Sequence, residues 1–166
     1  MSGSWKVTHC ALAIKCRLPP LKIQNNVANR GMTWCEMKYK IMNNDLTFGR
    51  SEEMKRKYQE AVSRIKMENK TVDQRILEKE FGNTREKTIL TPNEYPYYLQ
   101  VGIRHDILWS RDKLSREIIE DFIKCSNKLK NRECLWFINA QKDKSVKSVE
   151  HAHIISRLKG SKCICA

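Results

Sequence analysis

Three histidines stand in stretches that alternate like β-strands, and their side chains are the strongest candidates for chemistry. His151 and His153 lie one residue apart in EHAHIISR, and His105 lies in GIRHDILWS. Alternate residues of a strand point to the same face about 7 Å apart, so His151 and His153 can contact one ligand. If the two strands are neighbours, all three imidazoles lie on one face of a sheet.

Three imidazoles on one face are suited to several kinds of chemistry. They can bind a divalent metal ion that keeps an open coordination position. They can also bind a phosphate, or supply a nucleophile or a general acid, because the ordinary pKa of histidine is about 6.5. The alternative is structural, since histidine is often buried, and these rings can pack beside Ile107 and Trp109 within the sheet.

Further polar residues stand next to these strands. Asn93 lies in a turn before GIRHDILWS. Asn139 is the last residue of LWFIN, and Lys144 and Ser145 lie between this segment and HAHIISR. Polar groups at strand ends can converge on a ligand, so we expect all four to be ligand-binding candidates. Ordinary turn chemistry is the alternative, and for Asn93 it is the favoured one.

Each candidate has an expected role. We expect His151 or His153 to act as the acid, the base or a ligand contact, with His105 as their orienting partner. Lys144 is expected to contact an anion. The charged segment KDKSVKSVE precedes His151, so we expect His151 to be more accessible than His153.

Three N-terminal helices are the first elements that position these residues. Thr33, Ser51 and Thr71 are N-cap residues, and Glu36 and Gln74 complete capping boxes with the two threonines. Apolar residues follow each cap at helical spacing, and we expect these stripes to lie in the core. The stripe after Ser51 consists of Met54, Tyr58, Ala61, Val62 and Ile65.

From residue 88 the pattern changes to short extended segments. TILTPNEYPYYLQVG has two prolines and a glycine among β-formers, which indicates strands separated by turns. GIRHDILWS, CLWFIN and HAHIISR then predict three strands. Ser115 caps a helix between the first two of these, with Ile118, Ile119, Phe122 and Ile123 expected to point inward. The order predicts an α+β fold, with N-terminal helices packed on a small, mostly antiparallel sheet and one intervening helix.

Length and charge predict one domain with two basic ends. The chain has 166 residues and a net charge of +13. Residues 1–35 carry five Lys or Arg and no acid, and residues 139–166 carry six against two. We predict a basic arm at residues 1–31, a single domain at 32–158 and a basic tail at 159–166. A dedicated nucleic-acid-binding domain usually carries its basic stripe on the folded surface instead.

The cysteines and apolar runs bear on the compartment. No apolar run reaches the roughly 20 residues that span a bilayer, so we expect no transmembrane segment. The seven cysteines lack the paired spacing of a zinc site, which favours reduced thiols in a cytoplasmic protein. Mitochondrial import is an alternative, because residues 1–31 resemble a transit peptide. A second alternative is membrane association through prenylation of Cys163 in the C-terminal CICA.

Three blocks of this sequence are distinctive in their order and spacing: MTWCEMKYKIMNNDLTFGRSEEMKRKY, PNEYPYYLQVGIRHDILWS and LWFINAQKDKSVKSVEHAHIISR. Together they resemble the fungal N-acetylglucosamine-induced protein family, a domain family of unknown function, over about residues 32–157. The residues that match the family pattern are Asn93, Pro96, Tyr97, Gly102, His105, Trp109, Trp136, Asn139, Lys144, Ser145, His151 and His153. Glu94-Tyr95 and Ala140-Gln141 depart from it. The resemblance implies no established activity, and the sequence leaves any cofactor unknown.

Two functions are consistent with these residues. The leading hypothesis is an intracellular domain with a histidine-lined pocket for a phosphate-bearing or sugar-derived small molecule, with hydrolysis as the expected reaction. The alternative is a non-enzymatic interaction protein whose basic ends contact nucleic acid, acidic partners or a membrane.

Overall fold

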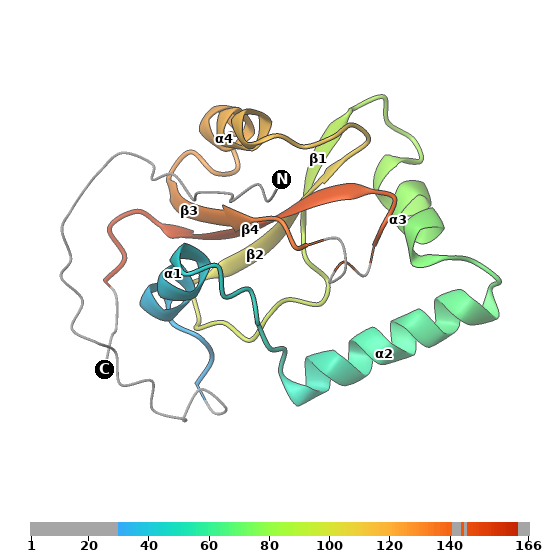
Figure 1. The fold of residues 1–166 in the computed structure, drawn as a ribbon, viewed down its shortest axis with the longest axis horizontal. Coiled ribbons are helices and arrows are strands. Elements are labelled where there is room, and N and C mark those ends of the chain that lie inside the picture. The colour runs from blue at the N-terminus through green and yellow to red at the C-terminus, as the bar shows by residue number, and fades with distance from the viewer. Residues whose placement is uncertain (1–29, 141–143, 145, 163–166) are drawn as a thin grey trace, which may run out of the picture.

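A computed structural model describes residues 30–140, 144 and 146–162, and their fold is shown in Figure 1. The helices are α1 (Trp34–Met42), α2 (Glu52–Met67), α3 (Val72–Phe81) and α4 (Arg116–Cys125). The strands are β1 (Thr88–Pro92), β2 (Arg104–Ser110), β3 (Arg132–Phe137) and β4 (Glu150–Leu158). Three helices thus precede an antiparallel sheet, and α4 lies between β2 and β3, which confirms the predicted α+β fold.

The sheet places the candidate histidines on one face. Its strand order is β1-β2-β4-β3, so β2 and β4 pair at the centre. Their register sets Ile107 opposite His153 and Trp109 opposite His151. Cross-strand partners point to the same face, and residues two apart along a strand share that face. His105 therefore lies on the same face as both histidines of β4.

Local sequence signals explain where the helices begin. The side chains of Thr33, Ser51, Thr71 and Ser115 each accept a hydrogen bond from the backbone N–H three residues later. The capping boxes at Thr33 and Thr71 are both present, as predicted. A side-chain cap of this kind contributes about 1 kcal/mol to helix stability.

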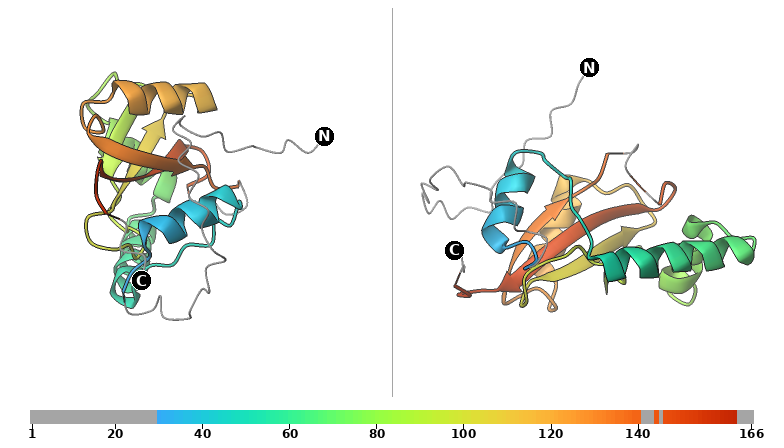
Figure 2. Two further views of the ribbon diagram at one scale, coloured as in Figure 1. Left: turned by 90° about the vertical axis from the view of Figure 1, so that its left-hand side faces the viewer. Right: turned by 90° about the horizontal axis from the view of Figure 1, so that it is seen from below.

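One face of the sheet is covered by α4 (Figure 2). The apolar cluster there consists of Leu90, Leu108, Leu114, Ile119, Leu129, Ala152 and Ile154. Ile119 is fully buried, but Ile118 is 45% exposed, so its predicted inward position is wrong. The two residues are adjacent, and successive helical positions lie on different faces, so only one of them points at the sheet.

The opposite face is covered in two separate places. Trp34, Met37 and Ile41 of α1 pack against Phe137 and Ile155. At the other end of the sheet, Phe81 of α3 packs in a cluster with Ile107, Trp109, Val146 and Val149. The histidine rings lie between these two clusters.

The apolar stripe of α2 does not lie in the core, contrary to prediction. No residue of α2 is buried. Tyr58, Ala61, Val62 and Ile65 are half-buried and line a cavity. The helix extends away from the sheet, and its C-terminal end lies beside α3 (Figures 1 and 2). Apart from Tyr58, whose ring contacts Tyr95 and Arg50, the stripe therefore lines the cavity and is not part of an apolar cluster.

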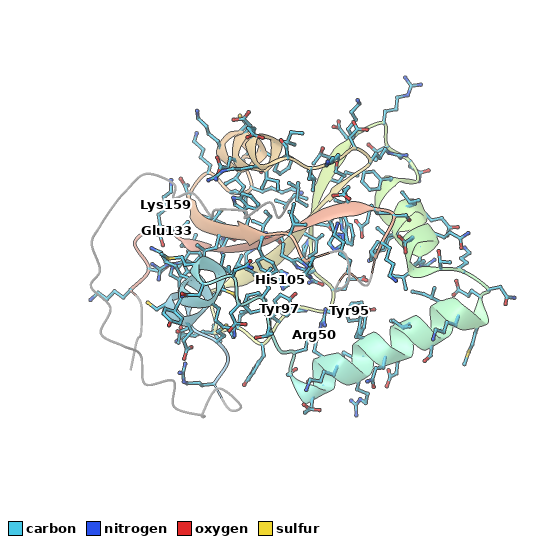
Figure 3. All side chains as sticks on the ribbon, viewed as in Figure 1. Arg50, Tyr95, Tyr97, His105, Glu133 and Lys159 are labelled. Carbon is cyan, nitrogen blue, oxygen red and sulfur yellow. The ribbon has the colours of Figure 1, made fainter. Side chains whose placement is uncertain are left out.

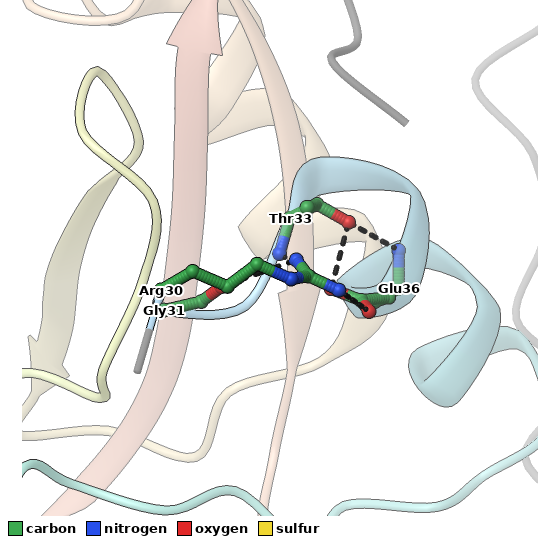
Figure 4. A network of polar contacts seen from close by, with 4 residues as sticks. All are labelled: Arg30, Gly31, Thr33 and Glu36. Atoms are coloured by element: carbon green, nitrogen blue, oxygen red, sulfur yellow. Dashed lines mark hydrogen bonds and ion pairs between the residues drawn. The ribbon is translucent and has the colours of Figure 1, made fainter. Parts of the chain in front are cut away.

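The segment before α1 is attached to the domain. Met32 pairs with Leu99 as an isolated β-bridge, through hydrogen bonds of 2.8 and 2.9 Å to the backbone of the facing segment. Gly31 has a φ of +70°, and a Cβ there would lie 2.7 Å from the backbone of Leu99, so only glycine fits. Arg30 forms an ion pair with Glu36, whose carboxylate also accepts from Thr33 (Figure 4).

Other features bear on the expected compartment. Cys125 and Cys134 are reduced, whereas Cys35 is disulfide-bonded, so the prediction of reduced thiols is wrong for Cys35. Cys163, the lipidation candidate, lies outside the described residues. Within the described part of the chain, every helix is too short or too polar to cross a bilayer.

We expect a chain of residues 30–162 to unfold in one cooperative transition. Under reducing conditions, where neither chain has the disulfide of Cys35, its urea midpoint should equal that of the full chain. The helix caps and apolar clusters described above all lie within this range. Circular dichroism during urea titration measures this. A chain of residues 34–162 is the matched control, and loss of the Met32 bridge is expected to lower its midpoint. A 30–162 chain with no cooperative transition would contradict the predicted domain boundaries.

Candidate functional site

The buried centre of the site is a hydrogen bond between two histidines. His105 Nε2 lies 2.9 Å from His153 Nδ1, and both side chains are buried. The backbone N–H of Tyr97 donates to His105 Nδ1 at 3.2 Å. That nitrogen is therefore unprotonated, and the neutral ring carries its proton on Nε2. It follows that His105 Nε2–H donates to His153 Nδ1.

The same argument fixes the tautomer of His153. Its Nδ1 accepts from His105, so its proton is on Nε2, which lies 3.1 Å from the amide of Asn139. The amide oxygen of Asn139 must then face the ring, since a half turn of the amide exchanges its oxygen and nitrogen. Three hydrogen bonds thus run in one direction from Tyr97 through His105 and His153 to Asn139. We call these four residues the histidine relay.

Asn93 forms a turn and also covers His105. Its side-chain oxygen accepts from the backbone N–H of Tyr95 at 2.9 Å, which is ordinary turn chemistry. Its amide nitrogen lies 3.2 and 3.4 Å from the two ring nitrogens of His105. Because it is almost equally far from both nitrogens, the amide lies over the face of the ring. Asn93 therefore makes the expected turn contact, and it also lines the cavity.

Aromatic packing and burial keep the relay neutral. His153 stacks on Phe137 at 4.8 Å between ring centroids, and His105 stacks on Tyr97 at 4.5 Å. Burial, with a smaller contribution from the charge of Arg50, lowers the pKa of His105 to about 3. Burial and then the neighbouring His105 hold the pKa of His153 well below its usual 6.5. Neither ring is charged near neutral pH.

His151 differs from the relay histidines in its hydrogen bonding. Its Nδ1–H donates to the backbone oxygen of Val149 at 3.0 Å, and its ring packs against Trp109. Among the described residues, Nε2 has no hydrogen-bond partner, whereas every fully buried side-chain nitrogen or oxygen has one. Nε2 is therefore accessible from the cavity that His151 lines. Burial lowers the pKa of His151, so this nitrogen carries a lone pair near neutral pH.

His151 is not more exposed than His153, contrary to the prediction. His151 is 4% exposed and His153 is 6% exposed. What distinguishes them is that His153 uses both ring nitrogens within the relay, whereas His151 uses one.

The loop before β4 is held by α3. Asp73 accepts hydrogen bonds from the backbone N–H groups of Lys147 and Ser148 at 3.0 and 2.6 Å. These bonds fix the loop just before Val149, whose carbonyl oxygen orients His151. The carboxylate of Asp73 thus helps to position the His151 ring from outside the sheet.

The cavity lies between the histidine face of the sheet and the helices α2 and α3. Its volume is about 1690 Å³, larger than the roughly 300–1,000 Å³ of typical ligand pockets. The expected site residues that line it are Asn93, Asn139, His151 and His153. His105 is not among the residues that line the cavity and lies near Tyr97, as Figure 3 shows. The structure thus brings five of the expected residues together.

Two further candidates are not part of this group. Lys144 is buried, and its Nζ lies 3.5 Å from a carboxylate oxygen of Glu150. It does not line the cavity, so the structure does not bring it to the position of an anion contact. Ser145 lies outside the described residues.

Arg50 is one of the cations that line the cavity, and sequence reasoning missed it. Its guanidinium lies over the rings of Tyr58 and Tyr97. In the sequence, Arg50 is merely the residue before the N-cap Ser51, and no local pattern connects it with residues 58 and 97.

The geometry bears on the metal alternative as well. Within the described ranges, no three His, Cys, Asp or Glu side chains form a group that could hold a metal ion. The physical reason is visible at His105 and His153, because a nitrogen of one is bonded to a nitrogen of the other instead of pointing at a common centre.

Comparison with known proteins gives one fold and one family. A crystal structure of HTC1 is similar to this chain, with a TM-score of 0.62 and 22% sequence identity over 77% of this chain and 86% of that one. At this identity the similarity concerns the fold. No curated protein matches. Residues 33–157, which contain the relay and His151, match the family described as "Protein of unknown function (DUF3605)", and the chain therefore belongs to this family.

Proposed function

We propose that the cavity binds a phosphate-bearing or sugar-derived small molecule and that His151 exchanges a proton with it. The observation that carries this proposal is the Nε2 atom of His151. It belongs to a buried side chain, has no hydrogen-bond partner among the described residues and is accessible from a cavity large enough to hold a small molecule. An oriented, neutral imidazole of this kind can accept a hydrogen bond or a proton from a ligand.

The relay positions the wall of the cavity rather than reacting. A relay histidine cannot take up a proton without losing an accepted hydrogen bond, because its unprotonated nitrogen already accepts one. His105 therefore acts through His153, whose Nε2–H holds the Asn139 amide at the cavity. This supports the expected role of His105 as an orienting partner.

A bound phosphate is expected to change the protonation of His151. The negative charge stabilises the imidazolium form, so binding raises the pKa of His151 from its lowered value and is accompanied by proton uptake. For a hydrolytic reaction, the His151 imidazolium formed on binding gives its Nε2 proton to the displaced oxygen, and the water that attacks the phosphorus loses a proton to solvent.

Thermal unfolding of the full chain with inorganic phosphate, sugar phosphates, nucleotides and N-acetylglucosamine tests this proposal. A ligand at 100 times its Kd raises the stability of the native state by about 2.7 kcal/mol, which is easily seen as a shift in Tm. We expect His151→Gln to abolish this shift, at a cost of about 1 kcal/mol to the unliganded protein. Release of inorganic phosphate from a stabilising ester tests hydrolysis.

The control is Lys124→Gln, which removes an exposed cation of α4, the helix on the opposite face of the sheet (Figure 2). It should leave the ligand shift unchanged. If no compound stabilises the full chain, the cavity is not its functional site. Binding of nucleic acid that weakens steeply with salt would then favour the interaction protein with basic ends.

A further inference from the structure

The side chain of Arg50 is held in place at the mouth of the cavity from three sides. Its Nε–H donates to the backbone oxygen of Tyr95 at 2.7 Å. Its guanidinium carbon lies 4.9 Å from the ring centroid of Tyr58 and 5.5 Å from that of Tyr97. In Figure 3, Arg50 lies at the start of α2, close to Tyr95 and Tyr97. Cation–π contacts on both sides leave the guanidinium little freedom to move.

The charge of Arg50 has no counter-ion in the described part of the chain. Its one hydrogen bond is the neutral contact of Nε with Tyr95, so both terminal nitrogens keep their donors. Arg64 and Arg75 also line the cavity and are without an ion pair among these residues. Lys79, in contrast, is paired with Glu94. An oriented guanidinium with free terminal donors is suited to a phosphate, whose oxygens it can bind in pairs.

The wall beside Arg50 is apolar. Tyr58, Ala61, Val62 and Ile65 of α2 and Ile76 of α3 are half-buried, and all of them line the cavity. They lie on one stripe of α2 and the adjoining side of α3. Apolar surface that faces a hollow gains stability when an apolar group replaces the water there.

We infer that the ligand of this cavity is a phosphomonoester with an apolar or aromatic organic part. Its phosphate binds to Arg50, and its organic part lies on the apolar wall formed by α2 and α3. This rests on the proposed function and narrows it, because a sugar phosphate would leave that wall in contact with hydroxyl groups. The negative phosphate and the apolar body match the unpaired cation and the uncovered stripe.

Isothermal titration calorimetry of the full chain at neutral pH tests this with three probes: inorganic phosphate, glucosamine 6-phosphate and phenyl phosphate. We expect phenyl phosphate to bind at least about tenfold more tightly than the other two, from the apolar area that it buries. Arg50→Gln should lower its affinity about tenfold or more, because a charge-assisted pair of hydrogen bonds is lost. Val62→Asp should remove the preference for phenyl phosphate over inorganic phosphate.

Arg56→Gln is the matched control, since Arg56 belongs to the same helix, is exposed and does not line the cavity. It should bind phenyl phosphate like the wild type. If Arg50→Gln does not fold, Arg50→Lys replaces it, because it keeps the charge but loses the paired donors, and the same direction of effect is expected.

The outcomes separate this inference from the proposed function. Equal or tighter binding of glucosamine 6-phosphate, or an affinity for phenyl phosphate that does not change in the Arg50 variant, overturns the inference and leaves the cavity as a ligand site. Failure of His151→Gln to alter binding, with the expected effects at Arg50 and Val62, overturns the role of His151 alone. If no phosphate ester binds, the inference falls, and the proposed function falls with it unless N-acetylglucosamine shifts the Tm.

Discussion

Replacing His153 by leucine is expected to lower the free energy of unfolding by about 3 kcal/mol, a large part of the stability of a small domain. Leucine fills a similar volume but has no polar atoms. The change therefore leaves the buried Nε2–H of His105 without its partner and removes the hydrogen bond to the half-buried amide of Asn139. It also removes the stacking of the ring on Phe137. Urea unfolding followed by circular dichroism measures the loss.

His151→Gln is the matched control, because it changes a histidine of the same strand and the same face. His151 makes one hydrogen bond, to the carbonyl of Val149, so its replacement is expected to cost about 1 kcal/mol. If both variants are equally stable, the side chains of the relay are not joined by buried hydrogen bonds. If His153→Leu is as stable as the wild type, the structural role assigned to His105 and His153 is wrong.

Local signals predict the elements of this fold well. Thr33, Ser51, Thr71 and Ser115 all cap the helices that their positions predict, because a cap depends on a hydrogen bond within three residues. The alternation in EHAHIISR likewise predicts that His151 and His153 share a face, which follows from strand geometry alone. Such features depend only on neighbouring residues and can be predicted from one sequence.

The histidine relay depends on strand register, which the sequence does not determine locally. His105 stands opposite Ile155, so it reaches His153 diagonally across the central strand pair. A shift of one residue would move it to the other face of the sheet. Sequence reasoning could therefore group the three histidines but could not predict that two of them bond each other and leave His151 as the one with an open nitrogen.

Arg50 and the α2 stripe show a second limit. The periodicity of Met54, Tyr58, Val62 and Ile65 predicts an apolar face, but it does not indicate whether that face meets protein or a hollow. The answer depends on contacts between distant segments, such as the bond from Arg50 to Tyr95, 45 residues away. The sequence likewise predicts Lys144 as the anion contact, because it does not show that the carboxylate of Glu150 lies beside this lysine.

The second large effect is expected in the pH dependence of stability. The pKa of His105 is lowered from 6.5 to about 3 in the folded protein, chiefly by burial, and the pKa of His153 is lowered well below 6.5. Below pH 6.5 the unfolded chain therefore binds protons that the folded protein does not bind. Stability from these residues is complete above pH 6.5 and is lost as the pH falls from 6.5 toward 3.

Between pH 7 and pH 5, His105 alone is expected to remove about 2 kcal/mol from the free energy of unfolding, with His153 acting in the same direction. Carboxylates such as Asp45 titrate below this pH range. The hydrogen bonds of Asp45 to Lys40 and Thr47 lower its pKa to about 2. Urea unfolding at pH 7 and pH 5 measures the difference. In His105→Gln, the loss between the two values should be smaller by about 2 kcal/mol. A wild-type stability that stays constant or rises toward pH 5 would mean that the buried histidines accept protons in the folded state, which the one-directional hydrogen bonds of the relay do not permit.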